Sequence, residues 1–320
     1  MTADPVRQIA DAVLYEGHIL WPYRRSALKN QQRWTFGGVY PAVYARSSSD
    51  RSVVTVECLV EGREPMVDVE VRFLHIVHRQ AAAGAGLQPV DEIAGFLTWD
   101  ETTERTVLLA GITGDAARCA PVDVPPGRAV EMVDGGALVR SWERLEGRVE
   151  ASVEPARAGV FRMRVRIENE SRCAELARDA AVRRSFLSAH AVLSARSGSF
   201  VSSIDPPSQL ADAAATLERD GLWPVLVGAA GDRSTMLASP IILSDYASVA
   251  PESPGDFFDG GEIDQLLVLN ILGMTDEEKR EMRAGDPRAR EILERTEAMT
   301  RDQLLQLHGV VRDLRPQGRA

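Results

Sequence analysis

A short acidic stretch, PESPGDFFDGGEID at residues 251–264, gathers side chains that could do chemistry. Five carboxylates fall within its fourteen residues: Glu252, Asp256, Asp259, Glu262 and Asp264. Carboxylate oxygens bind hard cations such as Mg²⁺ and Ca²⁺, and they also act as general acids or bases. The spacing, however, lacks the alternating ligands and the sixth-position glycine of an EF-hand loop. A metal site is therefore the weaker interpretation of this stretch.

The last part of the stretch has a second interpretation, as the start of a helix. Asp259 and Glu262 have the three-residue spacing of a capping box, in which each side chain accepts a hydrogen bond from a free amide of the first turn. An apolar face begins at Ile263, and both carboxylates would lie at the positive end of the helix dipole. We therefore favour helix capping for this pair, which leaves Glu252 and Asp256 unexplained.

The same helix-start pattern recurs along the C-terminal part of the chain. A start is expected at three further places: Thr275–Glu278, Asp286–Pro287 and Thr300–Gln303. Gly273 and Gly285 stand where glycine commonly ends a helix. The pattern predicts a series of helices from residue 262 to about residue 314.

Histidine and cysteine offer little to a metal or a nucleophilic site. His75 and His78 are three residues apart in a strand-like run, so they are expected on opposite faces and cannot chelate one ion. Three cysteines, Cys58, Cys119 and Cys173, are far apart and form neither a metal pair nor a disulfide framework. We expect reduced thiols, no metal and no cofactor.

A basic and aromatic segment near the N-terminus is the second polar feature. Its members are Tyr15, Trp21, Tyr23, Arg24, Arg25, Lys29, Arg33 and Trp34. Aromatic and arginine side chains are enriched at the hot spots of protein interfaces, so these residues are candidates for binding a protein partner. The alternative is a solvated helix face whose aromatic neighbours are buried.

The composition excludes several classes of function. The chain of 320 residues carries a formal net charge of −10, which argues against general binding of nucleic acid because phosphates attract cations. The sequence has no apolar run long enough to span a membrane and no basic N-terminal region followed by an apolar stretch. We expect a cytoplasmic protein.

The elements that would position these residues change character along the chain. Residues 37–170 contain several short runs rich in β-branched residues, which predict an antiparallel sandwich or open barrel. Residues 174–195 predict a helix that contains His190, and residues 208–219 predict another. We expect an α+β fold: an N-terminal segment at 1–36, a β-sandwich-like domain at 37–170, and a mixed domain with C-terminal helices at 171–320.

Several distinctive segments follow one another in a fixed order: LYEGHILWPYRRSALKNQQRWTFG, SFVSSIDPP, WPVLVG, SPIILSDYASVAPESPGDFFDGGEIDQLL and MTDEEKREMRAGDPRAREILER. In this order they resemble an uncharacterised protein family encoded within bacterial NiFe-hydrogenase gene clusters, beside the structural and maturation genes. The likeness runs across most of the chain and is weak between about 80 and 165. It implies a setting, hydrogenase assembly or function, and no mechanism.

The residues limit what such a protein could do. Insertion of nickel or iron would need clustered Cys and His ligands, and a nucleotide-driven step would need a phosphate loop. The sequence shows neither pattern. We therefore expect a non-enzymatic accessory or assembly protein for NiFe-hydrogenase maturation or function, which binds a hydrogenase subunit or a maturation factor partly through residues 15–34.

Two alternatives stay open. One is a hydrolase or metal-assisted transferase, which requires the N-terminal and C-terminal segments to meet in space. Its site would combine Arg24, Arg25 or Lys29 with four carboxylates: Asp205, Asp245, Glu252 and Asp256. The other is a structural subunit of a larger complex.

Overall fold

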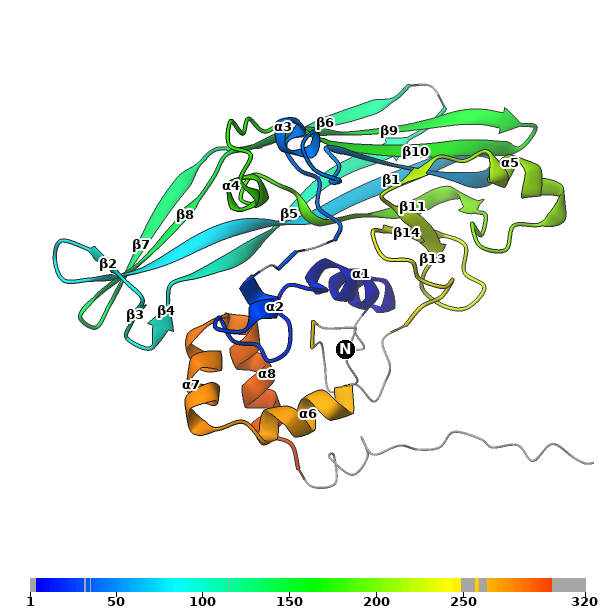
Figure 1. Cartoon of the computed structure of the whole chain (residues 1–320). Coiled ribbons are helices and arrows are strands. Elements are labelled where there is room, and N and C mark those ends of the chain that lie inside the picture. The colour runs from blue at the N-terminus through cyan, green and yellow to red at the C-terminus, as the bar shows by residue number, and fades with distance from the viewer. Residues whose placement is uncertain are drawn as a thin grey trace, which may run out of the picture.

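The computed structural model describes residues 4–31, 33–34, 36–114, 116–248, 257–258 and 264–300. Over these residues the protein is an α+β structure with one large sheet, in which every pairing between named strands is antiparallel. Figure 1 shows the sheet running across the molecule, with α1, α2 and the group α6–α8 together below it. No helix of the described ranges is both long and apolar enough to cross a membrane.

The helical elements are short. They are α1 (Pro5–Tyr15), α2 (Leu28–Gln31), α3 (Ala42–Ala45), α4 (Arg178–Val182), the 3₁₀ turn η1 (Ser208–Leu210), α5 (Ala211–Ala215), α6 (Asp264–Leu272), α7 (Asp276–Ala284) and α8 (Pro287–Glu297). The strands are β1 (Val53–Ala83), β2 (Gln88–Val90), β3 (Glu92–Ile93), β4 (Phe96–Leu97), β5 (Trp99–Ile112), β6 (Arg118–Val124), β7 (Gly127–Val133), β8 (Gly136–Trp142), β9 (Leu145–Arg157), β10 (Val160–Asn169), β11 (Leu187–Phe200), β12 (Arg219–Asp220), β13 (Trp223–Leu226) and β14 (Thr235–Ser239).

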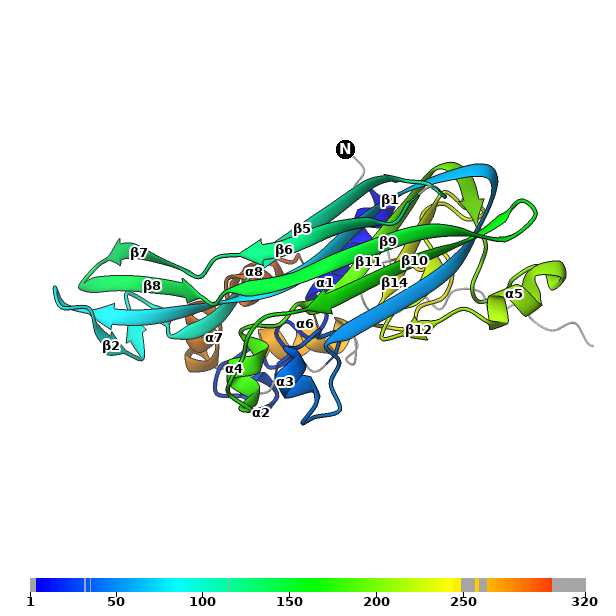
Figure 2. The same ribbon diagram turned by 90° about the horizontal axis from the view of Figure 1, so that it is seen from above.

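Strand β1 is 31 residues long and organises the sheet. Its first part pairs with β10, its middle part lies between β11 and β5, and its last residues pair with β8 and β2. Seen from above, it runs along most of the molecule beside β9 and β10 (Figure 2). The register with β11 shifts after Glu61, where Gly198 has a φ of +93° and a Cβ would meet the Glu61 carbonyl oxygen at 2.8 Å. Glycine is therefore required at this bend.

The sandwich expected from the sequence is not formed among the described strands. One hydrogen-bonded path, β13–β14–β11–β1–β10–β9–β6, leads through a single open sheet. The main hydrophobic core contains buried residues from before and after residue 170, including Val69 and Phe73 of β1, Val165 of β10 and Leu193 of β11. Because β1 is long enough to pair with different strands along its length, the sheet bends over this core without dividing in two. The sheet also continues past the domain boundary expected at residue 170, because β11 pairs with β1.

The helix expected over residues 174–195 was wrong for most of its length. Only α4 is helical there, and β11 begins at Leu187. The alanine-rich sequence has helical propensity, but Val192 pairs with Glu70 on one side and with Leu237 on the other, so pairing overrides propensity. His190 consequently lies in a strand, where it is fully buried. The helical stretch expected at 208–219 is confirmed in part by η1 and α5.

The prediction of C-terminal helices is confirmed as far as residue 297. Thr275 and Glu278 form the expected capping box, with the Glu278 amide donating to Thr275 Oγ1 at 3.3 Å and the Thr275 amide donating to Glu278 Oε2 at 2.9 Å. Asp286 caps α8 by accepting from the Arg288 amide at 2.9 Å. Gly285 ends α7 with a negative φ. The expected pairs Asp259–Glu262 and Thr300–Gln303 lie wholly or partly outside the described residues.

Candidate functional site

The basic and aromatic segment at residues 15–34, called from here on the N-terminal segment, packs against the C-terminal helices. The Tyr23 hydroxyl donates to the Phe257 carbonyl oxygen at 2.8 Å, and Arg24 pairs with Glu278 of α7 at 3.1 Å. The amide and hydroxyl of Ser26 both donate to Glu281, at 2.8 and 2.9 Å. Helix α7 therefore supplies two acidic partners of this segment, Glu278 and Glu281, while residues 251–256 lie outside the described ranges.

A buried contact between a histidine and a carboxylate lies at the centre of this region, called here the junction. His18 Nε2 is 3.0 Å from Asp286 Oδ2, and the Trp99 indole N–H donates to the same oxygen at 2.9 Å. The side chains of His18 and Asp286 are only 2% and 1% exposed. Burial alone would raise the pKa of Asp286, but His18, Arg33 and the Trp99 N–H outweigh it and hold that pKa well below its usual range.

Arg33 lies between two indole rings beside this pair. Its guanidinium carbon is 4.1 Å from the ring centre of Trp34 and 3.8 Å from that of Trp99. It donates to the carbonyl oxygens of His18 at 3.2 Å and Asp100 at 2.6 Å. Burial lowers the pKa of Arg33 to about 10, against the opposing effect of Asp286 and Asp100, so the group stays charged at neutral pH. Stacking and hydrogen bonding of this kind fix the ring positions.

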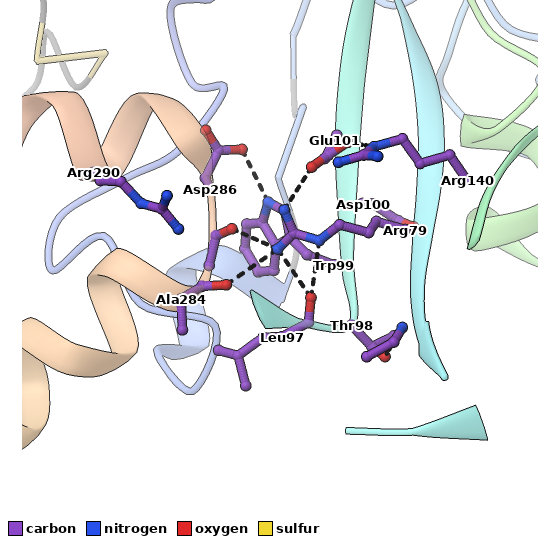
Figure 3. Close-up of polar contacts among 12 residues, drawn as sticks. Arg79, Leu97, Thr98, Trp99, Asp100, Glu101, Arg140, Ala284, Asp286 and Arg290 are labelled. Atoms are coloured by element: carbon purple, nitrogen blue, oxygen red, sulfur yellow. Dashed lines mark hydrogen bonds and ion pairs between the residues drawn. The ribbon is translucent and has the colours of Figure 1, made fainter. Parts of the chain in front are cut away.

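Arg79 joins the sheet to the same helices (Figure 3). From β1 its Nη2 donates to the carbonyl oxygens of Gly285 at 2.6 Å and Ala284 at 3.1 Å, and its Nη1 donates to Glu101 at 2.5 Å. The first two contacts place a cation on the free carbonyl groups at the C-terminal end of α7, where the helix dipole favours it. The Arg79 side chain is 1% exposed.

The residues of this junction have a structural role. Each of its central ionisable groups is at most 5% exposed, so a dissolved substrate has no access to His18, Arg33, Arg79 or Asp286. Each also has a partner within hydrogen-bond distance, which satisfies its buried polar atoms inside the fold. The role of these buried residues is therefore to hold the N-terminal segment against α7, α8 and β5.

The eight partner-binding candidates of the sequence divide into two groups. Four of them are buried within the fold: Tyr15, Tyr23, Arg33 and Trp34. Burial raises the pKa of the Tyr15 hydroxyl, with a further contribution from Glu104, to which it donates at 2.5 Å. Four lie nearer the surface: Trp21, Arg24 and Arg25 are half-buried and Lys29 is exposed. Beside them, Leu28 of α2 is 81% exposed, a feature that the sequence analysis did not single out.

The carboxylates expected to form a catalytic group have separate local roles where they are described. Asp245 accepts from the Ser202 hydroxyl at 2.5 Å and from the Leu226 amide at 2.8 Å, which ties the loop after β14 to its neighbours. Asp205 is exposed, and its amide donates to the same serine at 2.9 Å. Figures 1 and 2 place the following helix α5 well away from α2, where the expected basic partners lie. Glu252 and Asp256 are outside the described residues.

Metal ligands do not converge in the described ranges, where no group of three or more His, Cys, Asp or Glu could hold an ion. His75 is fully buried, whereas the His78 side chain is 26% exposed and bonds Asp100. The two histidines therefore differ in burial and in hydrogen-bond partners.

A small cleft around His78 escaped the sequence analysis. His78 Nδ1 lies 2.6 Å from Asp100 Oδ1, and Nη2 of Arg183, the residue directly after α4, lies 3.4 Å from both atoms. The strand register places Asp100 of β5 and Ser141 of β8 directly opposite His78 on either side of β1, and Ser141 lines the cleft with it. A histidine that is oriented by a carboxylate can transfer a proton. The sequence analysis missed this cleft because a sequence alone does not show which residues of neighbouring strands lie opposite each other.

The comparisons with known proteins add no relative. The chain matches no protein-family model and no curated protein.

Proposed function

We propose that the chain is an accessory or assembly protein that binds another protein, in the setting of NiFe-hydrogenase maturation or function. The setting comes from the family resemblance of the sequence segments. A binding role is supported by the N-terminal segment, in which buried anchors and exposed residues alternate within a short length of chain.

The observation that carries the proposal is the exposure of Leu28 on a fixed support. Leu28 is 81% exposed, although burying an apolar side chain of this size away from water would be favourable. Asn30, two residues on, is 5% exposed and closes the loop by accepting from the Leu20 amide and donating to the Leu20 and Arg24 carbonyl groups, at 2.8, 2.8 and 3.1 Å. Leu28 is thus held in place before any partner arrives, which lowers the entropy cost of binding.

The neighbours of Leu28 give the surface its chemical character. Lys29 is exposed beside it, and Arg25 is half-buried with its charge 3.6 Å from Asp91. An apolar side chain next to cations suits a partner that presents an apolar pocket with an acidic rim. We call Trp21, Arg24, Arg25, Leu28 and Lys29 the α2 surface.

The proposal is tested by capturing partners from cells that carry the native gene cluster. The tagged chain is used at low salt, and the bound proteins are quantified by mass spectrometry. We expect a hydrogenase subunit or maturation factor to be enriched. Leu28→Asp should weaken its capture about tenfold or more, because loss of an interface hot spot costs on the order of 2 kcal/mol.

Leu108→Asp is the matched control. Leu108 lies on β5, is 67% exposed and is outside the α2 surface, so its variant should capture the partner as the wild-type chain does. Absence of any hydrogenase-related protein from the wild-type capture would overturn the proposed setting. Equal loss of capture in both variants, or in neither, would overturn the assignment of the surface.

A further inference from the structure

An open cavity of about 320 Å³ lies on the sheet at strands β6, β9 and β10. Figure 1 shows these three strands at the top of the molecule. Its polar lining consists of Arg118, Cys119, Glu150, Ser152, Arg164 and Arg166. The volume is in the range of cavities that hold small molecules. Three guanidinium groups around one cavity are notable in a chain with a net charge of −10.

Strand geometry explains why these side chains meet. Arg164 pairs with Ser152 across β10 and β9, and Cys119 pairs with Glu150 across β6 and β9. Directly opposite residues of antiparallel strands project on the same face, and so do residues two apart in one strand. Arg164 and Arg166 therefore share the face that carries Ser152. Arg118 pairs with Ala151, whose side chain lies on the opposite face, and it lines the cavity from the first position of the edge strand β6.

The arginines keep hydrogen-bond donors free for a ligand. Arg118 is exposed, and its side chain has no hydrogen-bond or ion-pair partner among the described residues. Arg166 donates through Nη1 to Glu168 at 2.6 Å, and Arg164 donates through Nη2 to Glu218 at 2.9 Å. A guanidinium has five N–H groups, so each of these contacts uses only part of its capacity.

The acidic groups around the cavity leave it receptive to a negative ligand. Glu150 is the acidic member of the lining, and its carboxylate is turned toward neighbouring cations, 3.1 Å from Arg148 and 3.8 Å from Arg166. Glu168 neutralises Arg166 in part, and Glu218 and Glu57 do the same for Arg164. The charge of Arg118 has no such partner among the described residues. An anionic ligand at the cavity would therefore meet one guanidinium without an internal partner, that of Arg118, and the remaining donors of Arg166.

We propose that this cavity binds a small oxyanion, with Arg118 and Arg166 as the main contacts and Arg164 and Ser152 as supporting donors. The ligand class is a compact molecule that carries phosphate or paired carboxylate groups. Both kinds of group accept two parallel hydrogen bonds from one guanidinium. This binding activity goes beyond the proposed partner role and does not depend on it, because the cavity and the α2 surface share no residue.

Cys119 provides a direct reporter of occupancy. The chain has three cysteines, of which Cys58 and Cys173 are buried and Cys119 is exposed at the cavity. An uncharged maleimide should therefore modify Cys119 first, and a bound anion should slow the reaction by covering the thiol.

The experiment measures the rate of Cys119 modification in the full-length folded chain by peptide mass spectrometry. Inorganic phosphate, pyrophosphate and succinate are titrated separately, with sodium chloride holding the ionic strength constant. We expect one of them to slow the modification at least threefold with a saturating dependence, and the order of their affinities distinguishes a phosphate site from a dicarboxylate site. Arg118→Gln should raise the half-saturating concentration about tenfold.

Arg144→Gln removes one surface cation from the same sheet region outside the cavity and should leave the titration unchanged. Arg144 is 46% exposed and pairs with Asp123 and Glu146. Melting temperature in the same titrations gives a second readout, since a ligand that binds only the folded state raises it. The proposal is overturned if none of the anions protects Cys119 at ~10 mM, if sodium chloride protects equally, or if Arg118→Gln titrates as the wild-type chain does.

Discussion

The His18 ring and the Asp286 carboxylate lie 3.0 Å apart, although 268 positions separate them in the chain. Asp286 also begins α8, so one carboxylate caps a helix and pairs with the N-terminal segment at the same time. Trp99 donates to it from β5, which brings the sheet into the same contact. The N-terminal segment, the sheet and the C-terminal helices are therefore joined at a single buried charge.

Asp286→Asn should destabilise the protein by about 3 kcal/mol, because removing one partner leaves the rest of a buried polar cluster uncompensated. The amide still caps α8, so the variant isolates the loss of charge from the loss of the cap. The free energy of unfolding from urea titration measures the effect. Asp134→Asn, at an exposed turn between β7 and β8, is the control and should change that free energy by less than about 0.5 kcal/mol. A similar small change in both variants would contradict the role of Asp286.

Arg79→Met should loosen the helical group from the sheet. Methionine fills part of the same volume but cannot donate to the Ala284 and Gly285 carbonyl groups or pair with Glu101. We expect faster amide hydrogen exchange in α7 and α8, while exchange in β9 and β10 stays as in the wild-type chain. Arg140→Met, which removes a half-exposed partner of the same Glu101, is the control. Uniform acceleration over the whole chain would show that the effect is not confined to this joint.

Two buried histidines predict a loss of stability in mild acid. Burial lowers the pKa of both His75 and His190 to about 4, with nearby arginines acting in the same direction. In the unfolded chain both would titrate near 6.5, so the unfolded state binds more protons between pH 6.5 and pH 4. The stability that comes from keeping them neutral is present above pH 6.5 and falls as the pH approaches 4.

The free energy of unfolding should therefore drop by about 1–2 kcal/mol per histidine between pH 6.5 and pH 5. Aspartate and glutamate contribute little in this window, because their unfolded-state pKa values lie near 4. His190→Leu should reduce the slope by about half if the variant folds, and His75→Leu provides an independent repeat. A flat profile from pH 6.5 to pH 5 in the wild-type chain would refute this assignment.

The parts of the fold that follow from neighbouring residues could be predicted from the sequence. The starts of α7 and α8 are examples, because the capping side chains at Thr275 and Asp286 bond amides within three residues. The contacts of Arg33 could not be predicted, since Trp99 and Asp100 reach it through the pairing of β5 with β1.

Strand β11 shows the same limit for secondary structure. Its alanine-rich first half favours a helix locally, but two neighbouring strands fix it as extended chain. For the same reason the sequence identified the basic character of the N-terminal segment but not which side chains stay exposed. That depends on Glu278 and Glu281, which contact it from about 250 positions away.

Thr275→Ala should remove one half of the capping box at the start of α7. The Glu278 amide would lose its acceptor, and the cost should be about 1 kcal/mol in the free energy of unfolding. Thr275→Ser keeps the oxygen and should cost only a few tenths of that. Because Glu278 also pairs with Arg24 at 3.1 Å, loss of the cap should weaken the support under the α2 surface as well. Hydrogen exchange at residues 24–30 checks this coupling: faster exchange in Thr275→Ala but not in Thr275→Ser is expected, and equal exchange in both would show that the cap and the surface are independent.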